Sequence, residues 1–88
     1  MIRYIQNRNV MQSAIGDEVV MLEPETGYYF GLNSVAAVIW DELKNPKNIE
    51  ELVEVLLTRF EIDRGTCLEQ TRELVSTMLD KGVICSSN

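Results

Sequence analysis

Few residues of this chain have side chains suited to catalysis or metal binding. Its 88 residues include two cysteines, Cys67 and Cys85, and no histidine. The thiols form no CxxC pair, and a four-ligand zinc site would need carboxylates to complete it, which is uncommon for structural zinc. Without histidine, the commonest general base and the usual activator of serine or cysteine nucleophiles are missing. We therefore expect no metal site, no cofactor and no enzymatic activity.

The carboxylates are the remaining candidates for acid–base chemistry. They are scattered along the chain or lie on expected helix surfaces, as Glu50, Glu51 and Glu54 do, so solvated helix faces account for most of them. Fourteen acidic against eight basic residues give a net charge of −6. This charge repels phosphate backbones and anionic lipid surfaces. The composition favours a binding protein whose partner is neither nucleic acid nor a membrane.

The richest chemistry for binding lies in the stretch TGYYFGLNSVAAVIW, residues 26–40, where aromatic residues and a glycine precede an apolar pattern of helical spacing. The aromatic content of residues 28–32 is typical of a strand, whose alternate side chains face opposite sides. Gly31 lets another backbone approach closely. The candidate contact residues here are Tyr28, Tyr29, Phe30, Gly31 and Leu32. Packing in the core is the alternative for some of these rings.

Two further strands are expected before this one. Residues 10–15 and 18–22 are β-branched or apolar runs, and the Gly-Asp pair at 16–17 suits the positive φ angles of a tight hairpin turn. Turn residues at 23–27 then lead into the third strand, so the pattern predicts a three-stranded antiparallel meander. The opening residues, 1–6, alternate enough for another short strand, but their pattern leaves this open.

Two helices should follow the strands. Asn33 stands at the N-cap position of the first, which runs to about Leu43. Asn48 with Glu51 three residues later has the capping-box pattern that begins the second. The buried faces predicted from apolar spacing are Ala36, Ile39, Trp40 and Leu43 in the first helix and Ile49, Leu52, Val53, Leu56 and Phe60 in the second.

A third helix is expected from Cys67 to about Lys81. Thr66 with Glu69 repeats the capping-box pattern, and Gly82 is the stop signal. Its apolar or small positions spread over roughly 140° of the helix surface, a wide stripe for an end helix. They are Cys67, Leu68, Thr71, Leu74, Val75, Met78 and Leu79. One edge of this stripe can face the body of the protein while the other lines a groove; burial of the whole stripe is the alternative.

Three strands followed by three helices outline an α+β fold of the winged helix-turn-helix type, in a single domain spanning residues 1–88. In a DNA reader the third helix would bring basic residues to the major groove. Residues 63–81 instead carry four acidic and three basic residues, so this segment is acidic where a recognition helix needs positive charge. A transcriptional regulator stays open as an alternative that the charge disfavours.

Three segments together resemble a known family: GDEVVMLEPETGYYFGLNSVAAVIW, IEELVEVLLTRFEID and LVSTMLDKGVI. Their most specific parts are the Gly-x-Tyr-Phe-x-Leu-Asn run at residues 27–33, Trp40, and the ending LDKGVI at residues 79–84. In order and spacing they resemble the PqqD-like domains, the RiPP recognition elements, over about residues 10–85. Domains of that family bind the leader segments of ribosomally made precursor peptides.

The resemblance implies a site. In that family the leader peptide pairs with the open edge of the third strand and lays side chains into the cleft between this strand and the third helix. An exposed strand offers unpaired N–H and C=O groups, which agrees with this mode. The edge here would be residues 28–32. At its rim, Arg72 can pair with an acidic leader residue, whereas Glu23 and Glu25 beside the strand can attract a basic one. The residues carried over to the helix wall by position are Cys67, Thr71, Leu74 and Met78.

The resemblance also implies partners. A free-standing domain of this size is similar to the separate leader-binding half of a split lasso-peptide protease, which we favour, or to a carrier that presents a precursor to a radical SAM enzyme. We expect it to act in the cytoplasm, since the N-terminus lacks a signal-peptide core and no apolar run is long enough to span a membrane. A self-pairing adaptor, dimerising through the open edge, is a further alternative.

Overall fold

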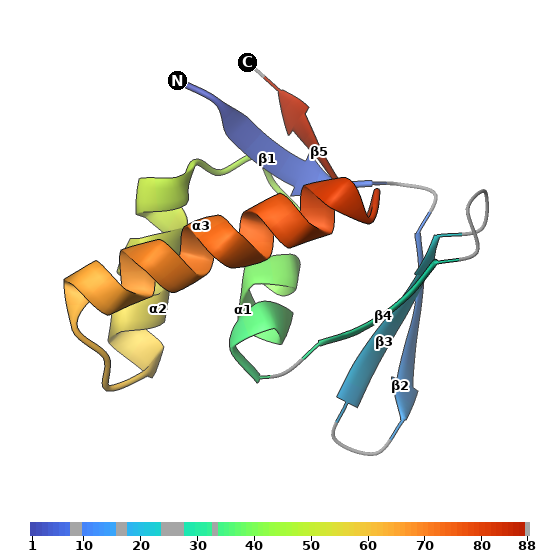
Figure 1. Ribbon diagram of the computed structural model, residues 1–88, viewed down its shortest axis with the longest axis horizontal. Coiled ribbons are helices and arrows are strands. Elements are labelled where there is room, and N and C mark those ends of the chain that lie inside the picture. The colour runs from blue at the N-terminus through green and yellow to red at the C-terminus, as the bar shows by residue number, and fades with distance from the viewer. Residues whose placement is uncertain (8–9, 16–17, 24–27, 33, 88) are drawn as a thin grey trace.

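The computed structural model describes residues 1–7, 10–15, 18–23, 28–32 and 34–87; within 11–32 it describes the backbone alone. The fold is α+β (Figure 1). The elements, in chain order, are β1 (Arg3–Gln6), β2 (Met11–Ile15), β3 (Glu18–Glu23), β4 (Tyr28–Leu32), α1 (Ser34–Glu42), α2 (Ile49–Arg59), α3 (Arg64–Asp80) and β5 (Ile84–Ser87).

The predicted three-stranded meander is confirmed. β2, β3 and β4 form an antiparallel sheet in that order, with Val20 opposite Gly31 where β3 meets β4. The strand bounds agree with the aromatic and β-branched runs in the sequence. The turn pair at 16–17 and the turn residues at 24–27 lie outside the described residues, as does the predicted N-cap Asn33. Because β4 stands last in this order, it is an edge strand of the sheet.

A second sheet, of two strands, pairs the two ends of the chain. β1 lies antiparallel to β5, with Arg3 opposite Ser87. The other side of β1 meets the segment after α1, where the Tyr4 N–H donates to the Lys47 carbonyl at 2.8 Å and the Gln6 N–H donates to the Leu43 carbonyl at 2.8 Å. β1 is therefore paired on both sides. Sequence analysis left β1 open and did not predict β5.

The start of α2 confirms the predicted capping box. The Glu51 N–H donates to Asn48 Oδ1 at 2.8 Å, and the Asn48 N–H donates to Glu51 Oε1 at 3.0 Å. Two N–H groups that lack a partner within the helix are thus satisfied reciprocally. Asn48 is also nearly buried, at 9% exposure, so its backbone and side chain depend on these bonds.

The predicted start of α3 is wrong. The helix begins three residues earlier, at Arg64, and its N-cap is Asp63 instead of Thr66. Asp63 Oδ2 accepts from the Thr66 N–H at 2.9 Å, and Asp63 Oδ1 accepts from the Thr66 hydroxyl at 2.8 Å. A carboxylate at the positive end of the helix dipole makes a strong cap, and it places Thr66 inside the first turn.

The predicted end of α3 is confirmed. Gly82 adopts a positive φ of 77°, and the Val83 N–H donates to the Met78 carbonyl at 3.1 Å. This is the left-handed turn that commonly ends a helix, and glycine adopts it without the strain that a Cβ would add. The turn sends the chain back along the helix end into β5.

The core lies between the three helices and the start of β5 (Figure 1). The predicted faces of α1 and α2 are confirmed, except that Ile49 and Phe60 are only partly buried. The buried apolar residues are Ala36, Ile39, Trp40, Leu43, Leu52, Val53, Leu56, Cys67, Val75, Met78, Val83 and Ile84. Every helix in the described part of the chain is too short or too polar to span a bilayer.

We predict that Asn48→Ala lowers the free energy of unfolding by about 1 kcal/mol, the usual cost of losing a helix N-cap. Urea unfolding followed by circular dichroism measures this. Asn45→Ala is the matched control, because Asn45 is exposed in the turn that precedes α2. Equal midpoints for the two variants would contradict the role of the capping box.

The Asp63 cap predicts a pH dependence of stability. Hydrogen bonds from the Thr66 N–H and hydroxyl lower the pKa of Asp63 below its ordinary value. The unfolded chain therefore takes up the proton first, and the stability that the carboxylate contributes is lost as the pH falls through its folded-state pKa.

We expect Asp63→Asn, which keeps a capping oxygen, to unfold at less urea than wild type at pH 7. The gap between the two urea midpoints should shrink as the pH is lowered through the acidic range, because the charge that distinguishes the two proteins is lost. A gap that stays constant down to pH 3 would show that the charge of Asp63 contributes nothing.

Candidate functional site

The open edge of β4 is the first feature suited to binding. β4 pairs with β3 on one side and ends the order of the sheet on the other. In antiparallel pairing, successive residues direct their N–H and C=O groups to opposite sides of the strand. About half of the backbone groups of Tyr28–Leu32 therefore point to the open edge, where another strand can pair with them. The rings of Tyr28, Tyr29 and Phe30 lie outside what the structure describes.

A hollow lies between the start of α1 and α3. β4 leads into α1 and contacts it (Figure 1). In the first turn of α1, Val35 lines a hollow of about 310 Å³ together with one side of α3. The residues of α3 that line it are Gln70, Glu73, Leu74 and Thr77. β4 thus leads through the start of α1 to this hollow.

Of the residues predicted for the helix wall, Leu74 lines this hollow. Cys67, Thr71 and Met78 are instead buried, at 2%, 0% and 0% exposure. Cys67 and Thr71 border a small pocket of about 20 Å³ that Val35 also lines, and Thr71 Oγ1 lies 4.0 Å from Cys67 Sγ. These three residues hold α3 against the core, so they support the wall from behind.

Sequence analysis missed the polar residues of the wall. Gln70, Glu73 and Thr77 share one side of α3 with Leu74 because positions i, i+3, i+4 and i+7 of a helix align. The same spacing was available from the sequence, but the search followed only apolar positions. The side of α3 that faces the hollow is therefore mixed, with one apolar side chain among polar ones.

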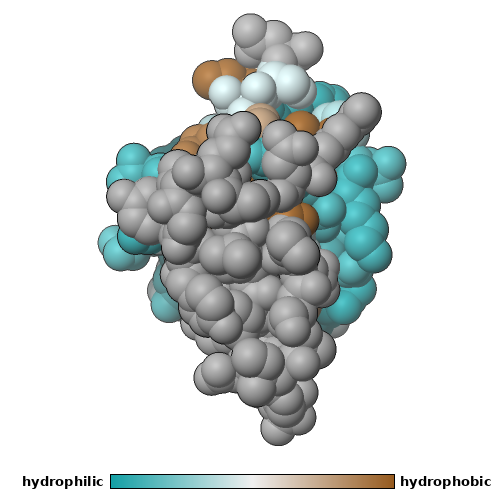
Figure 2. Space-filling view, turned by 90° about the vertical axis from the view of Figure 1, so that its right-hand side faces the viewer, coloured by the Kyte–Doolittle hydropathy of each residue, from teal (hydrophilic) through white to brown (hydrophobic). Residues whose placement is uncertain are grey.

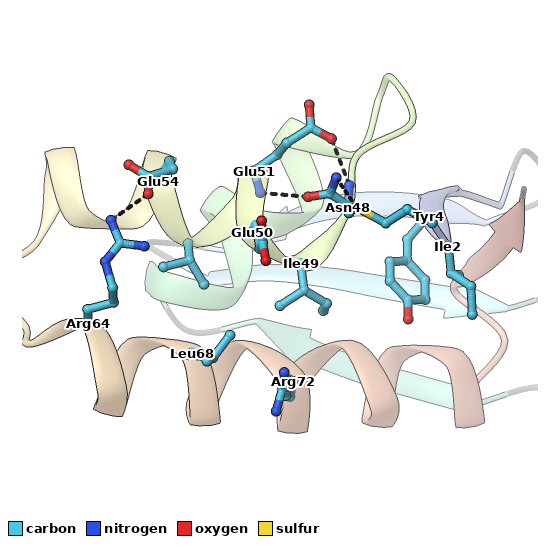
Figure 3. A pocket seen from close by; sticks show the side chains of 12 residues that line it. Ile2, Tyr4, Asn48, Ile49, Glu50, Glu51, Glu54, Arg64, Leu68 and Arg72 are labelled. Carbon is cyan, nitrogen blue, oxygen red and sulfur yellow. Dashed lines mark hydrogen bonds and ion pairs between the residues drawn. The ribbon is translucent and has the colours of Figure 1, made fainter.

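Arg72 lies on the other side of α3 and is not brought together with Leu74. It borders a larger groove, of about 700 Å³, between α2, α3 and the N-terminal residues (Figure 3). We call this the α2/α3 groove. It is lined by Met1, Ile2, Tyr4, Asn48, Ile49, Glu50, Glu51, Val53, Glu54, Arg64, Leu68 and Arg72. Sequence analysis did not predict it, since it depends on β1 lying beside the helices.

The charges of the α2/α3 groove are divided between its walls. The acidic residues come from α2 and the basic ones from α3. Arg64 forms an ion pair with Glu54, and Glu51 serves the capping box and lies 3.6 Å from Arg3. Exposed pairs of this kind contribute little to stability. Within the described part of the chain, Glu50 and Arg72 have no ion pair.

A further hollow, of about 340 Å³, lies beside the α2/α3 groove and shares Tyr4, Ile49 and Arg72 with it. Seen from the side of the three-stranded sheet, the described residues on both flanks are mostly hydrophilic, and hydrophobic residues gather at the upper end, where Figure 1 places β1 and β5 (Figure 2). Among the described residues, His, Cys, Asp and Glu side chains form no group of three or more that could hold a metal ion.

The chain matches one protein family and is similar to two solved structures. Residues 18–84 match the family described as "Coenzyme PQQ synthesis protein D (PqqD)". Among solved structures, the chain is similar to TbiB1 in complex with the TbiA(beta) leader peptide, with 32% identity, a TM-score of 0.80, and coverage of 91% of this chain and 93% of that one.

A second structure, of a lasso peptide synthetase B1 complexed with the leader peptide, shares the fold at 20% identity and a TM-score of 0.80, over 93% of this chain and 96% of that one. A comparison with curated proteins gave no match. The family match spans most of the chain, and the similarity to TbiB1 extends over nearly all of it. The chain belongs to the PqqD family.

Proposed function

We propose that this protein binds the leader segment of a ribosomally made precursor peptide and presents it to a maturation enzyme. The observation that carries the proposal is the open edge of β4, which leads into a helix that shares a hollow with α3. The two similar structures support it, because each is a complex with a leader peptide. The protein acts as a binding module and leaves catalysis to its partner.

The leader peptide joins the sheet as a further antiparallel strand beside residues 28–32. Backbone hydrogen bonds then supply affinity with little dependence on sequence, and pockets for alternate side chains supply selectivity. In the hollow, Val35 and Leu74 accept an apolar leader side chain, while Glu73 favours a basic residue next to it. Cys67, Thr71 and Met78 contribute indirectly, by fixing the position of α3.

The setting we favour is lasso-peptide maturation, in which the protein is a free-standing leader-binding partner of the leader peptidase; service to a radical SAM enzyme is the alternative. In this proposal residues 1–88 form one winged helix-turn-helix-like domain that reads a peptide strand instead of DNA. Because the precursor is made by ribosomes, the cytoplasm is the place of action. The net charge of −6 agrees with a peptide ligand and disfavours DNA.

Strand addition predicts a period of two in the leader peptide. We expect methylation of single backbone nitrogens of a labelled leader to weaken binding by about tenfold at alternate residues and little at those between, because only alternate N–H groups point to β4. Fluorescence anisotropy measures the Kd of each peptide. The leader is that of the precursor peptide of the same biosynthetic pathway.

Two results would overturn strand addition. A loss of affinity without alternation would mean that the peptide does not bind as a strand. A dimer in size-exclusion chromatography that ignores saturating leader peptide would mean that β4 pairs with a second copy of the chain, as in the self-pairing alternative.

If the hollow receives a leader side chain, a substitution that changes its lining should lower the affinity for the leader. Leu74→Glu replaces the one apolar side chain that α3 contributes to the hollow with a carboxylate, and we expect the Kd for the labelled leader to rise at least about tenfold. Leu68→Glu is the matched control, since Leu68 is also a partly buried leucine of α3 but lines the opposite side. Equal effects of the two variants on leader affinity would contradict the assignment.

A further inference from the structure

We propose that the α2/α3 groove is the docking site for an amphipathic helix of the maturation enzyme. This inference rests on the proposed function, because it names the surface by which the leader-bound protein meets its enzyme. The groove is the largest hollow described above, at about 700 Å³, and it faces away from the hollow that Leu74 lines.

The groove presents apolar surface to solvent. Ile49 from α2 and Leu68 from α3 point into the space between the two helices, with Tyr4 beside them (Figure 3). At one end, Met1 and Ile2 are 86% and 53% exposed, the large hydrophobic side chains most open to solvent in the described part of the chain. Contiguous exposed apolar surface with a charged rim marks a site of protein interaction.

The backbone around the groove favours a helix as occupant. Its long walls are the flanks of α2 and α3, whose N–H and C=O groups bond within each helix. β1 is paired with β5 on one side and with Leu43 and Lys47 on the other. An extended segment would therefore find few backbone partners here, whereas a helix brings its own backbone bonds and needs only an apolar face.

The charged residues at the rim of the groove indicate which charges a complementary helix carries. The α2 wall is acidic and the α3 wall is basic, and Glu50 and Arg72, which have no ion pair within the described residues, stand on opposite walls. A complementary helix carries a basic residue on one flank of its apolar stripe and an acidic residue on the other. Such charges fix the orientation of the docked helix and add modestly to its affinity.

The two sites lie on opposite sides of one helix. Leu68 and Arg72 of α3 line the α2/α3 groove, while Leu74 and Thr77 line the hollow beside α1. Between them runs the buried stripe that holds α3 to the core. Leader and enzyme can therefore bind this protein at the same time. The bound leader then holds the rest of the precursor near the enzyme, at an effective concentration on the order of millimolar if the connecting segment is short and flexible.

The test compares variants of the full chain against two probes: the labelled leader peptide, and the purified maturation enzyme of the same biosynthetic pathway. We expect Leu68→Glu to weaken enzyme binding at least about tenfold and leave the leader Kd within about twofold of wild type. Leu74→Glu should instead weaken leader binding and leave enzyme binding unchanged. Arg72→Glu, at an exposed position, should weaken enzyme binding about threefold, and this difference from wild type should fade with added salt.

Each outcome decides a different point. Wild-type enzyme affinity in both Leu68→Glu and Arg72→Glu overturns the docking site but leaves the proposed function standing if the leader still binds. If Leu68→Glu does not fold, Arg72→Glu alone decides. A loss of leader affinity in either variant assigns the groove to the leader and overturns the inference, as does a dimer that either variant dissociates. No leader binding by wild type overturns the proposed function itself.

Discussion

The packing of α3 against the core is the constraint on which the rest of this structure depends. Four residues of the helix, Cys67, Thr71, Val75 and Met78, are at most 2% exposed and form a straight stripe that packs into the core beside α2. A helix held along such a stripe has two flanks, and each flank becomes the wall of a separate surface. Since the stripe fixes the rotation of the helix about its axis, it also fixes which residues each surface receives.

Both ends of α3 are held as firmly as its middle. Asp63 caps the first turn with a carboxylate, and the turn at Gly82 reverses the chain so that Val83 and Ile84 re-enter the core at 0% and 2% exposure. β5 then lies against β1, and β1 closes one end of the α2/α3 groove. The cap and the turn fix the two ends of α3, and the small sheet fixes β1 beside it. The groove is thus formed by residues far apart in the sequence.

Much of the fold was predictable because it depends on local pattern. Ile39, Trp40 and Leu52 recur at helical spacing, and Asn48 with Glu51 forms the capping box that their order indicates. β5 was not predictable, since residues 84–87 have no strand pattern of their own and gain it only by pairing with residues about eighty positions earlier. The start of α3 was missed because two capping signals lie three residues apart, and the carboxylate of Asp63 prevails over the hydroxyl of Thr66.

In the candidate site, too, some features were predictable from local pattern and others were not. Residues 28–32 were placed on an edge strand, as their composition and the family resemblance implied, because strand order in a meander follows the chain. Arg72 was grouped with Leu74 although two residues of a helix differ by about 200° in direction, so the geometry of the helix alone separates them. The stripe pattern left the burial of Thr71 and Met78 open, because spacing within one helix does not say which part of a wide stripe faces the core.

The pairing of β1 with β5 has an architectural consequence. Arg3 and Ser87 are strand partners, so the two ends of the domain leave it side by side (Figure 1). A polypeptide that enters at one end and departs from the other needs no linker to travel around the domain. Neighbouring segments, or a host protein, can therefore join both ends of this fold at one place on its surface.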